Sequence, residues 1–135
     1  MRNFNNWNVP FSTICFFEDA LNSHTRIIKV NRERDIFFRI ERDDNSILRA
    51  LLLNEYRFGL ASLIRALEEF PETEYIIIGG NWNESTHEAD EYAKDNNIGI
   101  YNFSEFFSAI NYKNVPLGYI KKDERNNTKN TFRGA

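Results

Sequence analysis

The sequence contains little of what disulfide and zinc chemistry require. Its 135 residues include one cysteine, Cys15, and two histidines, His24 and His87. A single cysteine excludes an internal disulfide and indicates a reducing compartment such as the cytoplasm. The two histidines lie far apart in the chain, with no cysteine or second histidine at metal-ligand spacing, so the sequence gives no sign of a compact zinc site.

Long apolar runs and a strong charge imbalance are also missing. No segment approaches the roughly 20 apolar residues that cross a bilayer, and the N-terminus lacks the apolar core of a signal peptide, so we expect no membrane association. The net charge of -3 gives no support to a general nucleic-acid-binding surface, which usually has a basic excess. Basic residues nevertheless concentrate between Arg26 and Arg42 and after Lys121, and interspersed arginines are commonly a solvated strand face.

Aromatic residues are abundant instead, with 12 Phe, 6 Tyr and 2 Trp, and predict an aromatic-rich core. The length suits one domain. We expect this domain to span residues 1–120, and a polar, flexible tail to follow over residues 121–135, where hydrophobic periodicity is lost.

Hydrophobic periodicity predicts alternating helices and strands. The predicted helices cover residues 13–22, 60–71, 85–97 and 105–111, and the predicted strands cover 25–30, 35–42, 47–57, 74–80 and 98–101. The turn-rich segment 43–46 predicts a hairpin. The run from Ala50 to Leu53 is apolar on both faces, as in a central strand. This order predicts an α/β domain in which an antiparallel hairpin feeds a parallel sheet.

Two acidic residues flank the predicted hairpin. Asp35 opens its first strand, and Glu55 stands near the end of the second, two residues before Arg57. In a hairpin these positions meet at one edge of the sheet, and side-chain alternation would place Glu55 and Arg57 on the same face. Two carboxylates in an oxygen-rich pocket can hold Mg²⁺. The alternative is that each acid is solvated or paired with a nearby arginine, Arg57 or Arg34.

The order of elements, with an acid opening one strand and Glu-x-Arg closing the next, resembles the PD-(D/E)xK nuclease superfamily. The segment 85–101, followed by Ser104-Glu-Phe-Phe, resembles the C-terminal part of Mrr-like members of that superfamily. The resemblance spans residues 12–111. It implies a restriction-endonuclease-like αβββαβ core with a mixed central sheet flanked by helices.

The resemblance also implies an activity, the hydrolysis of phosphodiester bonds in DNA with Mg²⁺ or Mn²⁺ as cofactor. Asp35 and Glu55 would bind the metal, and Glu18 on the first helix would match an additional acid found in some members. Arg57 would stand where the family usually has lysine, and would stabilise negative charge on the phosphate.

Two departures from the family pattern leave a second function open. Arg57 stays protonated and is a poor proton acceptor, unlike lysine, and Arg34 precedes Asp35 where the family has proline. A catalytically inactive nuclease-like fold would instead be an interaction or inhibitor protein, for example an immunity, anti-defence or nucleic-acid-binding module. The sequence also leaves a homodimer open.

The pair Gly79-Gly80 ends a predicted strand and is followed by Trp82. The pair lacks the lysine and hydroxyl residue of a P-loop, and it lacks the three-glycine dinucleotide fingerprint. It therefore predicts a sharp turn at the end of the strand. A nucleotide-binding domain is a further alternative, which only this glycine pair supports. Trp82 could stack on a base or anchor a partner, and the other interpretation is packing over the neighbouring helix.

Overall fold

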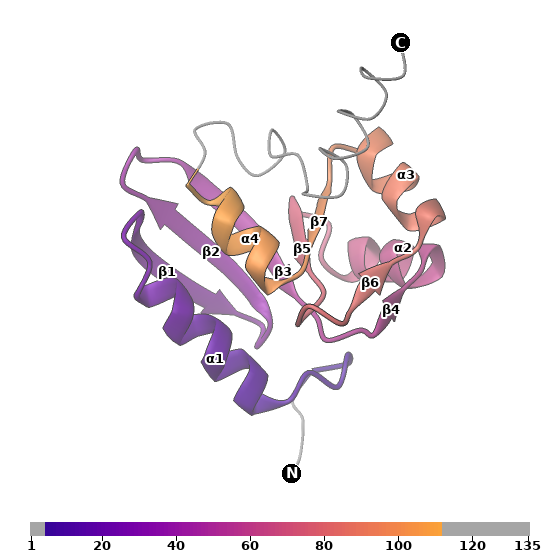
Figure 1. Ribbon diagram of the computed structural model, residues 1–135, viewed down its shortest axis with the longest axis horizontal. Helices are drawn as coiled ribbons and strands as arrows, with labels where there is room; N and C mark the ends of the chain where they lie inside the picture. The colour runs from indigo at the N-terminus through magenta and orange to yellow at the C-terminus, as the bar shows by residue number, and fades with distance from the viewer. Residues whose placement is uncertain (1–4, 112–135) are drawn as a thin grey trace, which may run out of the picture.

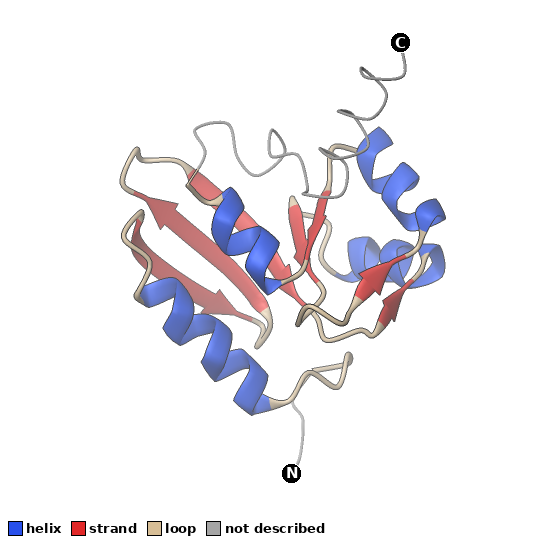
Figure 2. Ribbon diagram, viewed as in Figure 1, coloured by secondary structure: helices blue, strands red, loops and turns tan. Residues whose placement is uncertain are grey.

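The computed structural model describes residues 5–111, which form an α/β domain with a mixed five-stranded sheet flanked by helices (Figures 1 and 2). The α/β class expected from the sequence is confirmed. The predicted tail, residues 121–135, lies outside the described residues. Within them, no helix is long and apolar enough to cross a membrane. The elements are α1 (Phe11–Asn22), β1 (Ile27–Glu33), β2 (Phe37–Arg42), β3 (Ile47–Leu52), β4 (Arg57–Phe58), α2 (Leu60–Glu69), β5 (Tyr75–Ile77), β6 (Glu84–Ser85), α3 (His87–Asp95), β7 (Gly99–Tyr101) and α4 (Phe103–Ala109).

The main sheet has the strand order β1-β2-β3-β5-β7. Strands β1, β2 and β3 form an antiparallel meander, whereas β3, β5 and β7 run parallel. Phe37 is in register with Leu51, and Asn45 closes the connecting turn with a left-handed φ of +70°. The predicted hairpin is therefore confirmed. The apolar run from Ala50 to Leu53 is fully buried in and just after β3, between β2 and β5.

Helices α1 and α4 lie side by side on one face of the sheet (Figure 1). Phe17 of α1 is fully buried, and its ring centre lies 5.1 Å from that of Phe38 on β2. On the α4 side it lies 5.7–6.0 Å from the rings of Phe103, Phe106 and Phe107. Helix α2 packs against α3, which packs against β7. The aromatic core therefore ties α1, α4 and β2 together.

Two strand boundaries differ from the predicted ones, and both carry candidate site residues. β2 begins at Phe37 and not at Asp35, because Arg34 and Asp35 have φ of +48° and +73° and form the tight turn after β1. β3 ends at Leu52, and Arg57 belongs to the separate strand β4. The prediction that one strand extends to Arg57 is therefore wrong.

Strand β3 ends early because the residues that follow it leave the main sheet and pair elsewhere. The N–H groups of Leu53 and Glu55 still donate to the carbonyl oxygens of Ile77 and Ile78, at 2.8 and 3.1 Å. The chain then leaves the main sheet, and β4 pairs in parallel with β6 as a second, two-stranded sheet. Alternation along a single strand therefore does not relate Glu55 to Arg57.

Candidate functional site

Asp35 is held in the turn between β1 and β2. Residues 34–36 connect Glu33 to its partner Phe37, and two of them, Arg34 and Asp35, have left-handed backbone. Such conformations usually take asparagine or glycine and cost about 1–3 kcal/mol for other residues. The Asp35 carboxylate accepts a hydrogen bond from Nδ2 of Asn5 at 2.8 Å and another from Nη1 of Arg32 at 3.0 Å. Both of its oxygens therefore have partners within the fold.

Arg32 brings Glu18 and Asp35 together. Its Nε lies 3.5 Å from Oε2 of Glu18, and its Nη1 lies 3.0 Å from Oδ1 of Asp35. One guanidinium therefore compensates both carboxylates. Mg²⁺ is bound through carboxylate oxygens, and here a fixed cation already occupies the place between two of the three predicted ligands, so the acids as placed do not fit the ion. The arginine partner that the alternative interpretation expects is present, but it is neither Arg34 nor Arg57.

Glu55 lies between β3 and β4 and is half-buried. Burial raises the pKa of its carboxyl above the ordinary value, and the positive charge of Arg65 partly opposes this shift. Arg57, two residues later, is exposed. Within residues 5–111, neither Glu55 nor Arg57 takes part in an ion pair.

The register of the hairpin places Asp35 and Glu55 at the same edge of the sheet. The Leu52 N–H donates to the Ile36 carbonyl at 2.9 Å, so Asp35 lies opposite Leu53 and Glu55 follows two residues later. No hydrogen bond or ion pair joins the two acids, and the described part of the chain contains no group of three or more His, Cys, Asp or Glu side chains that could hold a metal ion. The structure thus brings Asp35 to Glu18 and leaves Glu55 and Arg57 outside that group.

Replacing Glu55 with glutamine should stabilise the fold slightly at pH 7. Because the folded-state pKa is raised, the ionised carboxyl is disfavoured in the fold, and the substitution removes that cost. The cost is fully present above the raised pKa and disappears as the pH falls below the unfolded value of 4.5. We therefore expect a gain below about 1 kcal/mol at neutral pH that vanishes near pH 3.5, measured by thermal unfolding. Glu68→Gln, at an exposed site on α2, is the matched control, and a gain confined to acid pH would contradict the sign.

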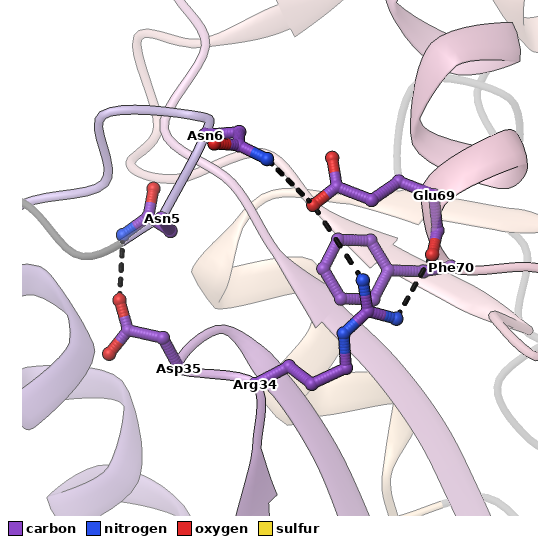
Figure 3. A pocket seen from close by; sticks show the side chains of 6 residues that line it. All are labelled: Asn5, Asn6, Arg34, Asp35, Glu69 and Phe70. Atoms are coloured by element: carbon purple, nitrogen blue, oxygen red, sulfur yellow. Dashed lines mark hydrogen bonds and ion pairs between the residues drawn. The ribbon is translucent and has the colours of Figure 1, made fainter.

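A surface pocket of about 330 Å³ opens beside Asp35 (Figure 3). The Arg34 guanidinium carbon lies 4.3 Å above the centre of the Phe70 ring, and Nη1 donates to the Glu69 carbonyl at 3.0 Å. The Glu69 carboxylate in turn accepts a hydrogen bond from Nε1 of Trp7 at 3.0 Å. These contacts tie the walls of the pocket together. The lining residues are Asn5, Asn6, Arg34, Asp35, Glu69 and Phe70.

Three residues around Asp35 were not predicted from the sequence: Asn5, Arg32 and Glu69. Asn5 precedes the first predicted element, and its Oδ1 accepts hydrogen bonds from the N–H groups of Trp7 and Val9. These bonds form a local turn that hydrophobic periodicity does not predict. Glu69 lies at the end of α2, far from Asp35 in sequence. Arg32 gave a usable signal, because it lies between two predicted strands and stands three residues before Asp35.

Trp82 projects from the turn between β5 and β6. It is 86% exposed, so the interpretation that it packs over the neighbouring helix is wrong. The Asn83 N–H donates to the Gly80 carbonyl at 3.0 Å, which places Trp82 at the third position of a β-turn. Gly79 has a φ of +114°, and the sharp turn predicted at the glycine pair is confirmed.

Comparisons with known proteins identify no relative. No protein-family model, no curated protein and no solved structure matches the chain. What the chain does must therefore be inferred from the geometry of residues 5–111.

Proposed function

We propose that this chain is a restriction-endonuclease-like fold that acts as a binding module and does not cut nucleic acid. The succession α1-β1-β2-β3-α2-β5, with an antiparallel meander followed by a parallel crossover, supports the αβββαβ core implied by the resemblance. Glu18 also comes from the first helix, as the resemblance implies, while Asp35 lies in the turn just before β2. The order and pairing of the elements are thus the basis for the proposed fold. Side-chain contacts are the basis for the proposed lack of cleavage.

The contact that carries the proposal is the one between Arg32 and the two acids. A cation fixed between Glu18 and Asp35 repels a second cation and would have to leave before either acid could act as a metal ligand. Arg57 adds to this, because it is exposed, permanently protonated and unable to accept a proton from a water molecule. Mild net acidity further favours a protein partner over nucleic acid.

We expect the full chain to leave single- and double-stranded DNA and RNA intact in the presence of Mg²⁺ or Mn²⁺. The measurement is a gel assay on end-labelled substrates, with thermal unfolding run in parallel to show that the protein is folded. Cleavage by the unmodified chain that is lost in both Asp35→Ala and Glu55→Ala would overturn the proposal and establish an enzyme.

A metal-dependent nuclease acting on DNA is the second candidate, and one observation favours it. Asp35 and Glu55 lie at the same sheet edge, and Glu55 has no ion-pair partner among the described residues. Arg32→Ala separates the two candidates, because it removes the guanidinium from Glu18 and Asp35. If Arg32→Ala cleaves DNA with Mg²⁺ and the double variant with Asp35→Ala does not, the nuclease replaces the binding module as the function of this site.

A further inference from the structure

Two aromatic side chains are exposed beside the two-stranded sheet. Trp82 is 86% exposed and Tyr56 is 77% exposed. The Glu84 N–H donates to the Tyr56 carbonyl at 2.9 Å, and Arg57 is in register with Glu84, so both aromatic residues lie where the chain enters β4 and β6. Tryptophan and tyrosine supply a large share of the binding energy in protein interfaces, and these two are left uncovered by residues 5–111.

The loop that carries Trp82 is held in place by side-chain contacts. Asn83 Nδ2 donates to the Ile78 carbonyl at 2.7 Å, and Ser104 Oγ donates to Oδ1 of Asn81 at 3.0 Å. The loop is therefore tied to the end of β5 and to α4. A side chain presented by a pre-organised loop loses less conformational entropy on binding, which favours a recognition role for Trp82.

Two exposed carboxylates follow Trp82 in the chain, one in β6 and one in the first turn of α3. Glu84 and Glu88 are exposed, and neither forms an ion pair within the described residues. Arg57 is in register with Glu84 across the small sheet but does not form an ion pair with it. On the main sheet and at the ends of its strands, by contrast, arginines form ion pairs with acids, in Arg26–Asp43, Arg39–Glu33 and Arg49–Glu74.

We infer that Tyr56, Trp82, Glu84 and Glu88 form a docking surface for an arginine-bearing, basic segment of a partner protein. A guanidinium stacks on the face of a tryptophan ring and pairs with carboxylates, so one arginine can use both kinds of group offered here. Nucleic acid fits the surface less well, because Glu84 and Glu88 repel phosphate. This inference rests on the proposed function, since it names the class of partner that the binding module takes.

The test is a calorimetric titration of the full chain with a nona-arginine peptide at about 50 mM and about 150 mM salt. Trp82→Ala should weaken binding about tenfold, and the double variant Glu84→Gln with Glu88→Gln about three- to tenfold. Arg57→Gln should tighten binding about two- to threefold, because it removes a repelling cation. A phosphate-binding site would respond in the opposite direction to that last change.

Two control variants distinguish this surface from general attraction to an acidic protein. Ile28→Ala removes an exposed apolar side chain from β1, and Asp19→Asn with Glu68→Gln removes two exposed charges from α1 and α2. Both should leave the affinity within about twofold of the unmodified chain. If the Asp19 and Glu68 variant weakens binding as much as the Glu84 and Glu88 variant, the docking surface is refuted.

Two further outcomes would overturn the assigned partner. A 12-nucleotide oligo-dT that binds more tightly than nona-arginine, and through Trp82, would make the partner a nucleic acid. A synthetic peptide of residues 112–135 that binds more tightly and also depends on Trp82 would make it the chain's own C-terminal segment. The two proposals fail in different experiments. Metal-dependent cleavage would refute the proposed function, whereas the peptide titration alone can refute the docking inference.

Discussion

Replacing Phe17 with alanine should lower the free energy of unfolding by about 3–5 kcal/mol, because the substitution opens a cavity where three elements meet. The Phe17 ring is fully buried and makes an edge contact with Phe38 of β2, with ring planes at 80°. It also packs against the phenylalanines of α4. Urea denaturation followed by circular dichroism measures the loss. The change should shift the midpoint and not the slope.

Phe16 provides a matched control at the preceding position of the same helix. Its ring lies 5.2 Å from that of Phe103, but its side chain is 55% exposed, so Phe16→Ala removes little buried area. We expect a loss below about 1 kcal/mol. Equal losses at Phe16 and Phe17 would contradict the placement of the aromatic core between α1, α4 and β2.

The fold was largely predictable because its signals are local. The turn residues 43–46 predicted the β2–β3 hairpin, and the apolar run from Ala50 to Leu53 predicted a strand buried on both faces. The end of β3 was not predictable in the same way. The residues from Leu53 to Arg57 contain neither glycine nor proline, and the chain leaves the sheet because β4 pairs with β6, about 27 residues further along. Pairing over such a distance leaves no trace in periodicity.

For the candidate site, the sequence predicted that two acids lie close together but not how they are paired. Sequence reasoning assigned Glu18 and Asp35 to one site, and the structure does bring them together. The sequence could not predict that the Arg32 guanidinium lies between the two acids. The position of Arg32 depends on the register of β1 with β2 and on the left-handed turn that follows. The choice between a metal site and an ion-pair network therefore depends on one side chain that belongs to no motif.

Replacing Arg42 with alanine should lower the free energy of unfolding by about 2–4 kcal/mol, through lost packing and lost hydrogen bonds. The residue ends β2 and is only 2% exposed. Its Nη1 donates to the Ile110 carbonyl at 3.0 Å, and its Nε donates to Ser46 Oγ at 2.7 Å. Its Nη2 lies 3.7 Å from the Asp44 carboxylate. Urea denaturation measures the total loss, and hydrogen exchange of the amides over residues 106–111 locates it at the end of α4.

Comparison with Arg42→Met divides that loss into its parts. Methionine keeps much of the aliphatic stem and removes the charge and the donors, so the methionine variant should lose about 1–3 kcal/mol and exchange its α4 amides almost as fast as the alanine variant. Arg49→Met, in a partly exposed pair with Glu74 at 3.5 Å, should cost less than about 1 kcal/mol and leave those amides unchanged. If Arg42→Met is as stable as the unmodified chain, the contacts to Ile110 and Ser46 add nothing beyond packing. If it is destabilised with fast exchange in α4, a buried guanidinium is what fastens α4 to the hairpin, as Arg32 joins α1 to the β1–β2 turn through Glu18 and Asp35.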